Sequence, residues 1–267
     1  MSVTPNRRTV SRTDGQMLTI LQKLRREILL LRDVLYYRLI FDHTSEQTVV
    51  EQFHKLYFES HVFGKAWMSS SWMGVPVHKC PTDLWTYQEL IYEIKPDVIV
   101  ETGTLLGGSA YYLASLCDLV GNGRVITVDV DSTEESVSRE RSAVTEVRPV
   151  HPRLTYLLGS STSKEILLQV KNLIQDSDKV LVVLDSDHRK THVLDELRAY
   201  APLVSIGSYL IVEDTNINGH PILSEFGPGP MEAVAEFLTT NKNFVADRSR
   251  ERHFLTFNPG GYLRRDK

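Results

Sequence analysis

Short apolar runs, several of them ending in an acidic residue, recur along the chain from residue 98 onward. Rich in β-branched residues, they predict buried strands at 98–101, 124–129, 154–158, 179–185 and 207–213. Stretches of about a dozen residues with helical periodicity separate these strands. The alternation of strand and helix predicts an α/β fold with a doubly wound, mostly parallel sheet.

The turn after the first of these strands is rich in glycine. Residues 98–110 read V-I-V-E-T-G-T-L-L-G-G-S-A, which predicts a strand, a tight turn and the start of a helix. Such turns bind nucleotides in α/β proteins, where a Cβ would obstruct the close approach of the backbone to the ligand. The spacing is G-x-x-x-G-G and differs from the dinucleotide pattern G-x-G-x-x-G. Glu101, two positions before the first glycine, suits a cofactor with amino or hydroxyl groups, although a purely structural turn remains the alternative.

Carboxylates end four of the five predicted strands. The carboxyl ends of parallel strands face one crevice, so these groups should meet there. Asp129 ends the second strand, where a carboxylate can accept two hydrogen bonds from a ribose diol. The fourth and fifth strands contribute Asp185, Asp187, Glu213 and Asp214, with His188 beside them. Because such charges repel unless a cation lies among them, the group predicts a hard divalent ion, Mg²⁺ before Mn²⁺ or Ca²⁺. Helix capping is the alternative role for Asp187 and Asp214.

The N-terminal part of the chain predicts a long helix outside this fold. Apolar residues follow a 4-3-4-3-4 heptad spacing at Met17, Leu21, Leu24, Ile28, Leu31 and Leu35. This helix either pairs between subunits or packs on its own domain, because further apolar residues widen its face. We predict a flexible arm at 1–16, a helical extension at 17–60 and a catalytic domain at 61–267.

Outside the central strands, the pattern predicts smaller features. Residues 61–81 form a loop with Trp67 and Trp72, which either pin the loop or cover a ligand site. Helices are expected at 83–94 and 231–239. Two edge strands are expected at 244–246 and 253–257, and the last seven residues read as a solvated tail.

The composition and net charge of the chain disfavour some classes of function and location. The chain has 267 residues and a formal net charge of -4, so no bulk positive charge favours nucleic acid or a membrane surface. Cys80 and Cys117 lack metal-ligand spacing and read as thiols in a reducing compartment. The N-terminal residues lack a signal pattern, and no apolar run approaches 18 residues, so we expect a cytoplasmic protein.

Several motifs together resemble one enzyme family. They are Glu101-Thr-Gly-Thr with Gly107-Gly-Ser-Ala, Leu184-Asp-Ser-Asp-His, Gly207-Ser-Tyr-Leu-Ile-Val-Glu-Asp, Trp72-Met-Gly-Val, Lys79-Cys-Pro-Thr-Asp-Leu-Trp and Leu255-Thr-Phe-Asn-Pro. In combination they resemble the cephalosporin hydroxylase/rhamnosyl O-methyltransferase family from about residue 50 to the end. The heptad helix lies outside this resemblance.

The resemblance implies an S-adenosylmethionine-dependent, Mg²⁺-assisted O-methyltransferase with a seven-stranded, Rossmann-like class I sheet whose last strand is antiparallel. It assigns the cofactor to residues of the glycine-rich turn and of the later strand ends: Glu101, Gly103, Thr104, Gly107, Ser109, Asp129, Ser160, Ser161 and Asp185. It assigns the metal to Asp187, Glu213 and Asp214. Asp185 is the alternative to Asp187, because offsets of 28 and 26 residues before Glu213 are both plausible.

The chemistry expected from these parts is methyl transfer to an acceptor hydroxyl. His188 is the candidate general base, with His192 and His220 as alternatives. The acceptor would be a sugar or polyhydroxylated secondary metabolite, as in natural-product tailoring and antibiotic biosynthesis. A homo-oligomer is expected, with no nucleic-acid or membrane partner. The alternatives are a hydroxylase-type tailoring enzyme of the same family and a non-catalytic assembly module with a vestigial cofactor site.

Overall fold

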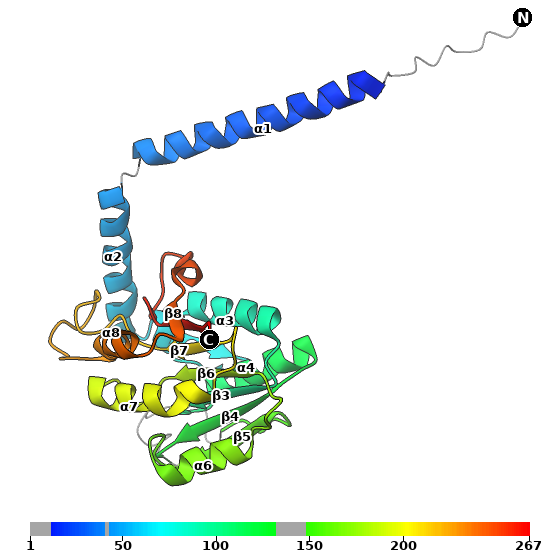
Figure 1. Ribbon diagram of the computed structural model, residues 1–267. Coiled ribbons are helices and arrows are strands. Elements are labelled where there is room, and N and C mark those ends of the chain that lie inside the picture. The colour runs from blue at the N-terminus through cyan, green and yellow to red at the C-terminus, as the bar shows by residue number, and fades with distance from the viewer. Residues whose placement is uncertain (1–11, 41–42, 132–147) are drawn as a thin grey trace, which may run out of the picture. The chain divides into compact units, whose positions relative to one another are not determined.

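The computed structural model describes residues 12–40, 43–131 and 148–267 (Figure 1). The chain divides into two compact units between Glu51 and Gln52. Helix α1 (Arg12–Ile40) and the first half of α2 (His43–Glu59) belong to the first unit. Of the predicted arm at 1–16, residues 1–11 lie outside the described residues, and the others begin α1.

The second unit is built on a seven-stranded sheet with the order β5-β4-β3-β6-β7-β9-β8. Its strands are β3 (Val98–Thr102), β4 (Arg124–Asp129), β5 (Leu154–Leu158), β6 (Val180–Leu184), β7 (Tyr209–Val212), β8 (Phe244–Ala246) and β9 (Tyr262–Arg265). Strands β5, β4, β3, β6 and β7 are parallel, whereas β9 is antiparallel to both of its neighbours. This confirms the predicted α/β fold, a doubly wound, mostly parallel sheet with an antiparallel last strand.

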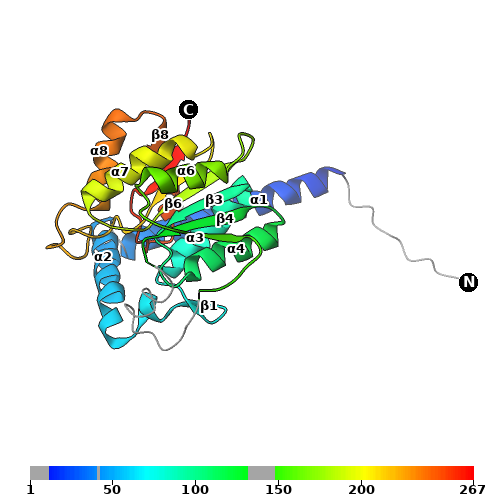
Figure 2. The same ribbon diagram turned by 90° about the horizontal axis from the view of Figure 1, so that it is seen from below.

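Helices cover both faces of the sheet (Figure 2). One face packs against α3 (Pro81–Ile94) and α4 (Gly108–Val120). The other packs against α6 (Lys164–Asn172), α7 (Lys190–Tyr200) and α8 (Pro230–Thr240). Burial on both faces explains why the parallel strands read as continuous apolar runs. The helix expected between β4 and β5 falls largely on residues 132–147, which lie outside the described residues.

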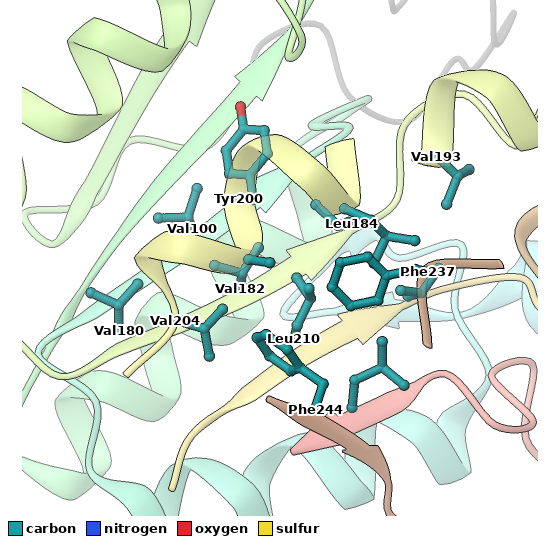
Figure 3. Close-up of a cluster of buried hydrophobic side chains, with 14 of the residues drawn as sticks. Val100, Val180, Val182, Leu184, Val193, Tyr200, Val204, Leu210, Phe237 and Phe244 are labelled. Atoms are coloured by element: carbon teal, nitrogen blue, oxygen red, sulfur yellow. The ribbon is translucent and has the colours of Figure 1, made fainter. Parts of the chain in front are cut away.

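The core shows the period of two expected of a strand. In β3, Val98 and Val100 pack toward α6, α7 and α8, whereas Ile99 packs toward α3 and α4. Figure 3 shows the cluster of buried side chains between the sheet and helices α6, α7 and α8. In this cluster Val100, Val182 and Leu210 of neighbouring strands lie close to Tyr200 and Phe237 of the covering helices. Each fully buried Val, Leu or Phe stabilises the fold by about 1.5–3 kcal/mol.

The C-terminal edge differs from the expectation in two places. Residues 253–257 form no strand. The side chains of Leu255 and Phe257 instead pack against Tyr57, Phe58 and Trp67. The last strand is instead β9, in the segment predicted to be a solvated tail. Its residues Tyr262 and Leu263 are fully buried between β7 and β8. Two buried residues followed by two arginines are too short a pattern to indicate a strand.

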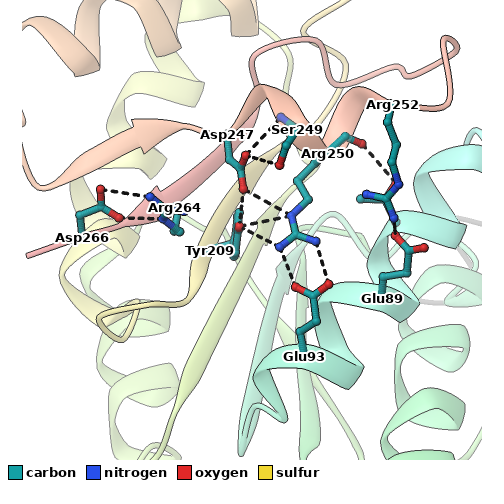
Figure 4. A network of polar contacts seen from close by, with 10 residues as sticks. Glu89, Glu93, Tyr209, Asp247, Ser249, Arg250, Arg252, Arg264 and Asp266 are labelled. Atoms are coloured by element: carbon teal, nitrogen blue, oxygen red, sulfur yellow. Dashed lines mark hydrogen bonds and ion pairs between the residues drawn. The ribbon is translucent and has the colours of Figure 1, made fainter. Parts of the chain in front are cut away.

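An arginine-centred polar network holds the segment after β8 to the rest of the sheet (Figure 4). This segment includes a short 3-10 helix, η4 (Arg248–Glu251). Arg250 donates two hydrogen bonds to the Glu93 carboxylate of α3, at 3.0 and 2.6 Å, and lies against Tyr209 of β7. Arg252 pairs with Glu89, also on α3. The connection between β8 and β9 is therefore tied to α3 and β7.

The predicted boundary after residue 60 differs from the observed division. His54, in the second half of α2, is buried, stacks on Phe257 and accepts a 2.9 Å hydrogen bond from Asn216. Burial lowers the pKa of His54 to about 4. The second half of α2 therefore belongs to the sheet unit.

The predicted loop at 61–81 contains short regular elements. These are η1 (Ser60–Phe63), η2 (Ala66–Ser69), β1 (Ser71–Trp72) and β2 (Val75–Pro76), while η3 (Ala201–Leu203) follows α7. Among the described helices, none is long and apolar enough to cross a bilayer.

Candidate functional site

A cavity of about 680 Å³ lies at the carboxyl ends of the parallel strands. Its volume is in the range of small-molecule and cofactor sites. Of the residues predicted for the site, those lining this cavity are Gly103, Asp129, Ser161, Asp185, Asp187, His188 and Asp214. Parallel neighbours end at the same edge of a sheet, which is why residues far apart in sequence meet here.

Of the residues predicted for the cofactor and the metal, six do not line this cavity: Glu101, Thr104, Gly107, Ser109, Ser160 and Glu213. Glu101 is fully buried, accepts a 2.7 Å hydrogen bond from Thr127 on Oε2, and has its pKa raised by burial. The Ser109 side chain interacts with the Glu101 carboxylate and acts to lower its pKa, and Glu101 Oε1 and Ser109 Oγ have no other hydrogen-bond partner in the described chain. A carboxylate oxygen and a hydroxyl can each take more than one hydrogen bond, so these two atoms are also candidates for contact with a ligand.

The glycines of the turn are required by the protein itself. Gly103 has φ +86°, and a Cβ on it would lie 1.8 Å from the carbonyl oxygen of Asp185. Gly107 has φ +79°, and a Cβ on it would lie 3.0 Å from the Tyr156 hydroxyl. At Gly103, which also lines the cavity, the close approach that the structure shows is between the turn after β3 and the end of β6.

Asp129 is held by donors on three sides. Its Oδ2 accepts hydrogen bonds from the Leu105 amide at 2.7 Å and from Arg148 Nη2 at 3.2 Å. Its Oδ1 accepts one from the Asp131 amide at 3.1 Å. Arg148 also donates to the carbonyl oxygens of Leu105 and Asp131. The carboxylate predicted to hold a ribose is thus fixed in place at the cavity wall.

Asp185, His188 and Asp214 form a compact group on the other side of the cavity. One ligand atom from each residue lies within 4.8 Å of the others. Asp214 has φ +53°, and its amide donates a 3.1 Å hydrogen bond to Asn258 Oδ1. His188 Nε2 lies 3.2 Å from Asp214 Oδ2. Burial would lower the pKa of His188, but the charges of Asp214 and Asp185 outweigh it and raise the pKa above its usual value.

Lys79 is a buried cation that binds Asp185 of this group, and the sequence pattern did not indicate a role for it. Its Nζ donates to Asp185 Oδ2 at 2.6 Å and to Glu213 Oε1 at 2.5 Å, and its side chain is 2% exposed. Burial would lower the pKa of Lys79, but the two carboxylates raise it. Burial in turn raises the pKa of Asp185 to about 6 and that of Glu213 to about 7. Tyr87 also donates to Glu213, at 2.7 Å.

Asp187 lies apart from this group although it also lines the cavity. It accepts hydrogen bonds from the Arg189 amide at 2.9 Å and from Arg189 Nε at 2.8 Å. Hydrogen bonding to Arg189 lowers the pKa of Asp187 to about 2. The sequence left open whether Asp185 or Asp187 is the metal ligand. In the structure, Asp185 lies close to Asp214 and His188.

The other predicted side chains divide between cavity and surface. His192 lines the cavity, with Nε2 3.1 Å from Ser186 Oγ and 3.2 Å from Ser161 Oγ. His220 instead contacts Glu232 at 2.9 Å, outside the cavity lining. Trp67 lines the cavity together with His78, which the sequence analysis did not single out.

Comparison with known proteins assigns the family. The sequence model of the family Rhamnosyl O-methyltransferase/CmcI matches residues 64–266. The rhamnosyl O-methyltransferase of Mycobacterium tuberculosis (strain ATCC 25618 / H37Rv) is 37% identical over 228 residues, covering 84% of this chain and 88% of the relative. The chain belongs to this family. The rhamnosyl O-methyltransferase of Mycobacterium leprae (strain TN) is 32% identical over 220 residues, covering 81% of this chain and 90% of the relative.

Solved structures agree with the fold of the Rhamnosyl O-methyltransferase/CmcI family. The structure described as "cmcI-D160 Mg-SAM" has a TM-score of 0.56 and 20% identity, and it covers 75% of this chain and 78% of that chain. The form described as "CmcI-N160 apo-structure" has a TM-score of 0.54 and 20% identity, covering 75% of this chain and 77% of that chain. The family resemblance and the class I sheet predicted from the sequence are both confirmed.

Proposed function

We propose that this protein is an S-adenosylmethionine-dependent O-methyltransferase that methylates a hydroxyl of a sugar or polyhydroxylated metabolite with the help of Mg²⁺. The observation that carries the proposal is the cavity in which Asp129 lies on one side and Asp185, His188 and Asp214 on the other. The curated relatives are named rhamnosyl O-methyltransferases, which supports a sugar hydroxyl as the acceptor.

The residues of the β3 and β4 ends fit the cofactor. Asp129 Oδ1 accepts one hydrogen bond within the protein and can accept another from a ribose hydroxyl, and Ser161 lines the same cavity. Glu101 and Ser109, whose side chains interact with each other, retain hydrogen-bonding capacity for the methionine part. Thr104, Gly107 and Ser160 shape the turns around these groups. The Asp185 backbone lies against Gly103, and Asp185 lines the cavity, where its negative charge would favour a sulfonium.

The residues of the β6 and β7 ends fit a hard divalent ion. Asp185 and Asp214 offer the carboxylate oxygens that Mg²⁺ prefers. Glu213 and Asp185 both bind Lys79, so that contact does not distinguish them. The set implied by the family resemblance, Asp187, Glu213 and Asp214, would require Asp187 to leave Arg189, whereas one ligand atom of Asp185 already lies within 4.8 Å of Asp214 and His188. We therefore favour Asp185 and Asp214 as ligands. When bound, the ion would supply positive charge that lowers the pKa of the acceptor hydroxyl.

His188 is the proposed general base. Methyl transfer is a displacement at a sulfonium that is already a good leaving group, so the protein must orient the acceptor and take its proton. Asp214 fixes one ring nitrogen of His188, which leaves the other to accept a proton from the acceptor hydroxyl. Trp67 and His78 form part of the cavity wall and would exclude water from the acceptor.

The hydroxylase alternative finds less support in this geometry. Non-haem iron oxygenases use two histidines and one carboxylate, whereas the group here has one histidine and two carboxylates. Mg²⁺ is therefore the better fit.

The test is calorimetric titration with S-adenosylmethionine, with and without Mg²⁺, combined with methyl transfer to a rhamnoside. We expect micromolar cofactor binding by the unmodified protein. Asp214→Asn should keep cofactor binding and lose Mg²⁺ binding. His188→Asn should keep both and lower turnover by about 100-fold or more. Asp195→Asn, an exposed change on α7, is the control. Absence of cofactor binding with or without Mg²⁺ would overturn the proposal, and full activity of Asp214→Asn would overturn its metal part.

A further inference from the structure

Helix α1 exposes many large apolar side chains. Between residues 20 and 40 they are Ile20, Leu21, Leu24, Ile28, Leu29, Leu30, Leu31, Val34, Leu35, Tyr36, Tyr37, Leu39 and Ile40, each 39% exposed or more. Contiguous apolar surface of this kind marks an interaction site, and an unsupported helix is only marginally stable in water. The helix therefore needs a partner to bury this surface.

The positions of these residues identify a coiled-coil seam. With Leu21 at heptad position a, the a positions are Leu21, Ile28 and Leu35, and the d positions are Leu24, Leu31 and, where the seam ends, Arg38. A β-branched residue at the central a position with leucine at d favours two parallel strands. The seam thus fits a second copy of the same helix.

The charges beside the seam select the orientation. Glu27 is at position g, and Arg25 and Arg32 are at position e. In a parallel, in-register pair, g of one helix faces e of the next heptad in the other, so Glu27 faces Arg32 twice by symmetry. In an antiparallel pair, e lies beside e, and arginines would meet arginines. Charge complementarity therefore favours the parallel arrangement.

We propose that α1 pairs with α1 of a second copy of this chain as a parallel, in-register, two-stranded coiled coil, with Glu27 of each copy facing Arg32 of the other. In the single chain, Arg32 contacts Asp33 at 2.7 Å, but both side chains are more than 60% exposed. Such exposed pairs exchange partners at little free-energy difference. Tyr37, outside the seam at position c, already donates to Glu46 of its own chain. This proposal does not depend on the proposed catalytic function.

A charge swap in the full-length protein tests the pairing. Sedimentation equilibrium should show that Glu27→Lys and Arg32→Glu each weaken self-association by about tenfold, because each turns two attractive pairs into two repulsive ones. The double variant should restore the association of the unmodified protein. The matched control is Lys23→Glu at position c, which changes the charge as Arg32→Glu does without facing the partner. A monomeric unmodified protein at micromolar concentration, or single variants that associate like it, would overturn the proposal.

A cysteine at the seam tests the orientation. In a parallel, in-register pair, position 24 lies beside itself, so Leu24→Cys should form a disulfide-linked dimer under mild oxidation. Lys23→Cys, one residue away from the seam, should not. The native Cys80 and Cys117 are buried and should not cross-link under the same conditions. Failure of Leu24→Cys to cross-link would overturn the parallel register. Cofactor titration of each variant shows separately whether the catalytic unit is intact.

Discussion

On both sides of the cavity, a carboxylate predicted from the sequence binds a cation that the prediction did not include. At the β4 end, Asp129 binds Arg148 at 3.2 Å. At the β6 and β7 ends, Asp185 and Glu213 bind Lys79 at 2.6 and 2.5 Å. The two sides share a principle, because a buried or half-buried carboxylate needs a partner that replaces water.

The two sides of the cavity differ in the other hydrogen-bond donors that bind their carboxylates. Asp129 also accepts hydrogen bonds from two backbone amides, those of Leu105 and Asp131. Among the described residues, Lys79 donates a hydrogen bond to the Asp185 carboxylate, and both Lys79 and Tyr87 donate hydrogen bonds to the Glu213 carboxylate. Backbone donors stay in place when a side chain changes, so Asp129 can lose Arg148 more easily than Asp185 and Glu213 can lose Lys79.

Replacing Lys79 should therefore have the largest effect. Lys79→Met leaves two neighbouring carboxylates buried without their cation and should lower the free energy of unfolding by about 3–5 kcal/mol. Denaturant unfolding measures this loss. The pKa values of Asp185 and Glu213 are raised to about 6 and about 7, so the folded state binds more protons than the unfolded state. The contribution of these two carboxyl groups to the free energy of unfolding therefore falls as pH rises. The free energy of unfolding that Lys79→Met loses should accordingly be larger at pH 8 than at pH 5.

A second variant keeps this prediction decidable if Lys79→Met fails to fold. Lys79→Met combined with Glu213→Gln removes one of the two charges and should recover part of the lost stability, since the introduced amide oxygen can still accept a hydrogen bond from Tyr87. Lys65→Met, at an exposed lysine, should leave stability unchanged. A Lys79→Met protein within about 1 kcal/mol of the unmodified one would show that Lys79 does not neutralise a buried pair.

The two sides should also separate by ligand. Asp129→Asn removes the charge and one acceptor proposed for the ribose, and should weaken S-adenosylmethionine binding by about 10- to 100-fold. Mg²⁺ binding should stay unchanged, because the proposed ligands lie on the other side. Calorimetry measures both, with the exposed Asp176→Asn as control. If Asp129→Asn binds the cofactor as tightly as the unmodified protein, the ribose does not lie at Asp129.

The sequence predicts the strands and their acids well because both are local patterns. Val98, Ile99 and Val100 form a β-branched run, and Glu101 follows directly. Pairing is not local. Lys79 lies 106 residues before Asp185, in a loop whose chemistry gives no sign of where its side chain points. The burial of Lys79 therefore could not be read from the sequence.

Two other differences have local causes that the sequence does contain. Asp185 and Asp187 look equivalent as acids, but Arg189, two residues after Asp187, binds that carboxylate with its side chain and amide. Strand β9 is buried because β7 and β8 flank it, while the more apolar segment 253–257 is drawn to the aromatic cluster with Trp67. Which of the two segments forms the last strand therefore depends on the packing partners available to each, and not on hydrophobicity alone.

Replacing Arg148 should have the smallest effect of the three. Arg148→Met removes hydrogen bonds to Asp129 and to the carbonyl oxygens of Leu105 and Asp131, but Asp129 keeps its two backbone donors and borders the cavity. We expect the free energy of unfolding to fall by about 1–2 kcal/mol, clearly less than for Lys79→Met, in the same denaturant experiment. Arg198→Met, at a side chain that is 60% exposed, should change it by less than about 0.5 kcal/mol. If Arg148→Met were as destabilising as Lys79→Met, the backbone amides would not be sufficient support for Asp129, and the two sides of the cavity would depend on their cations equally.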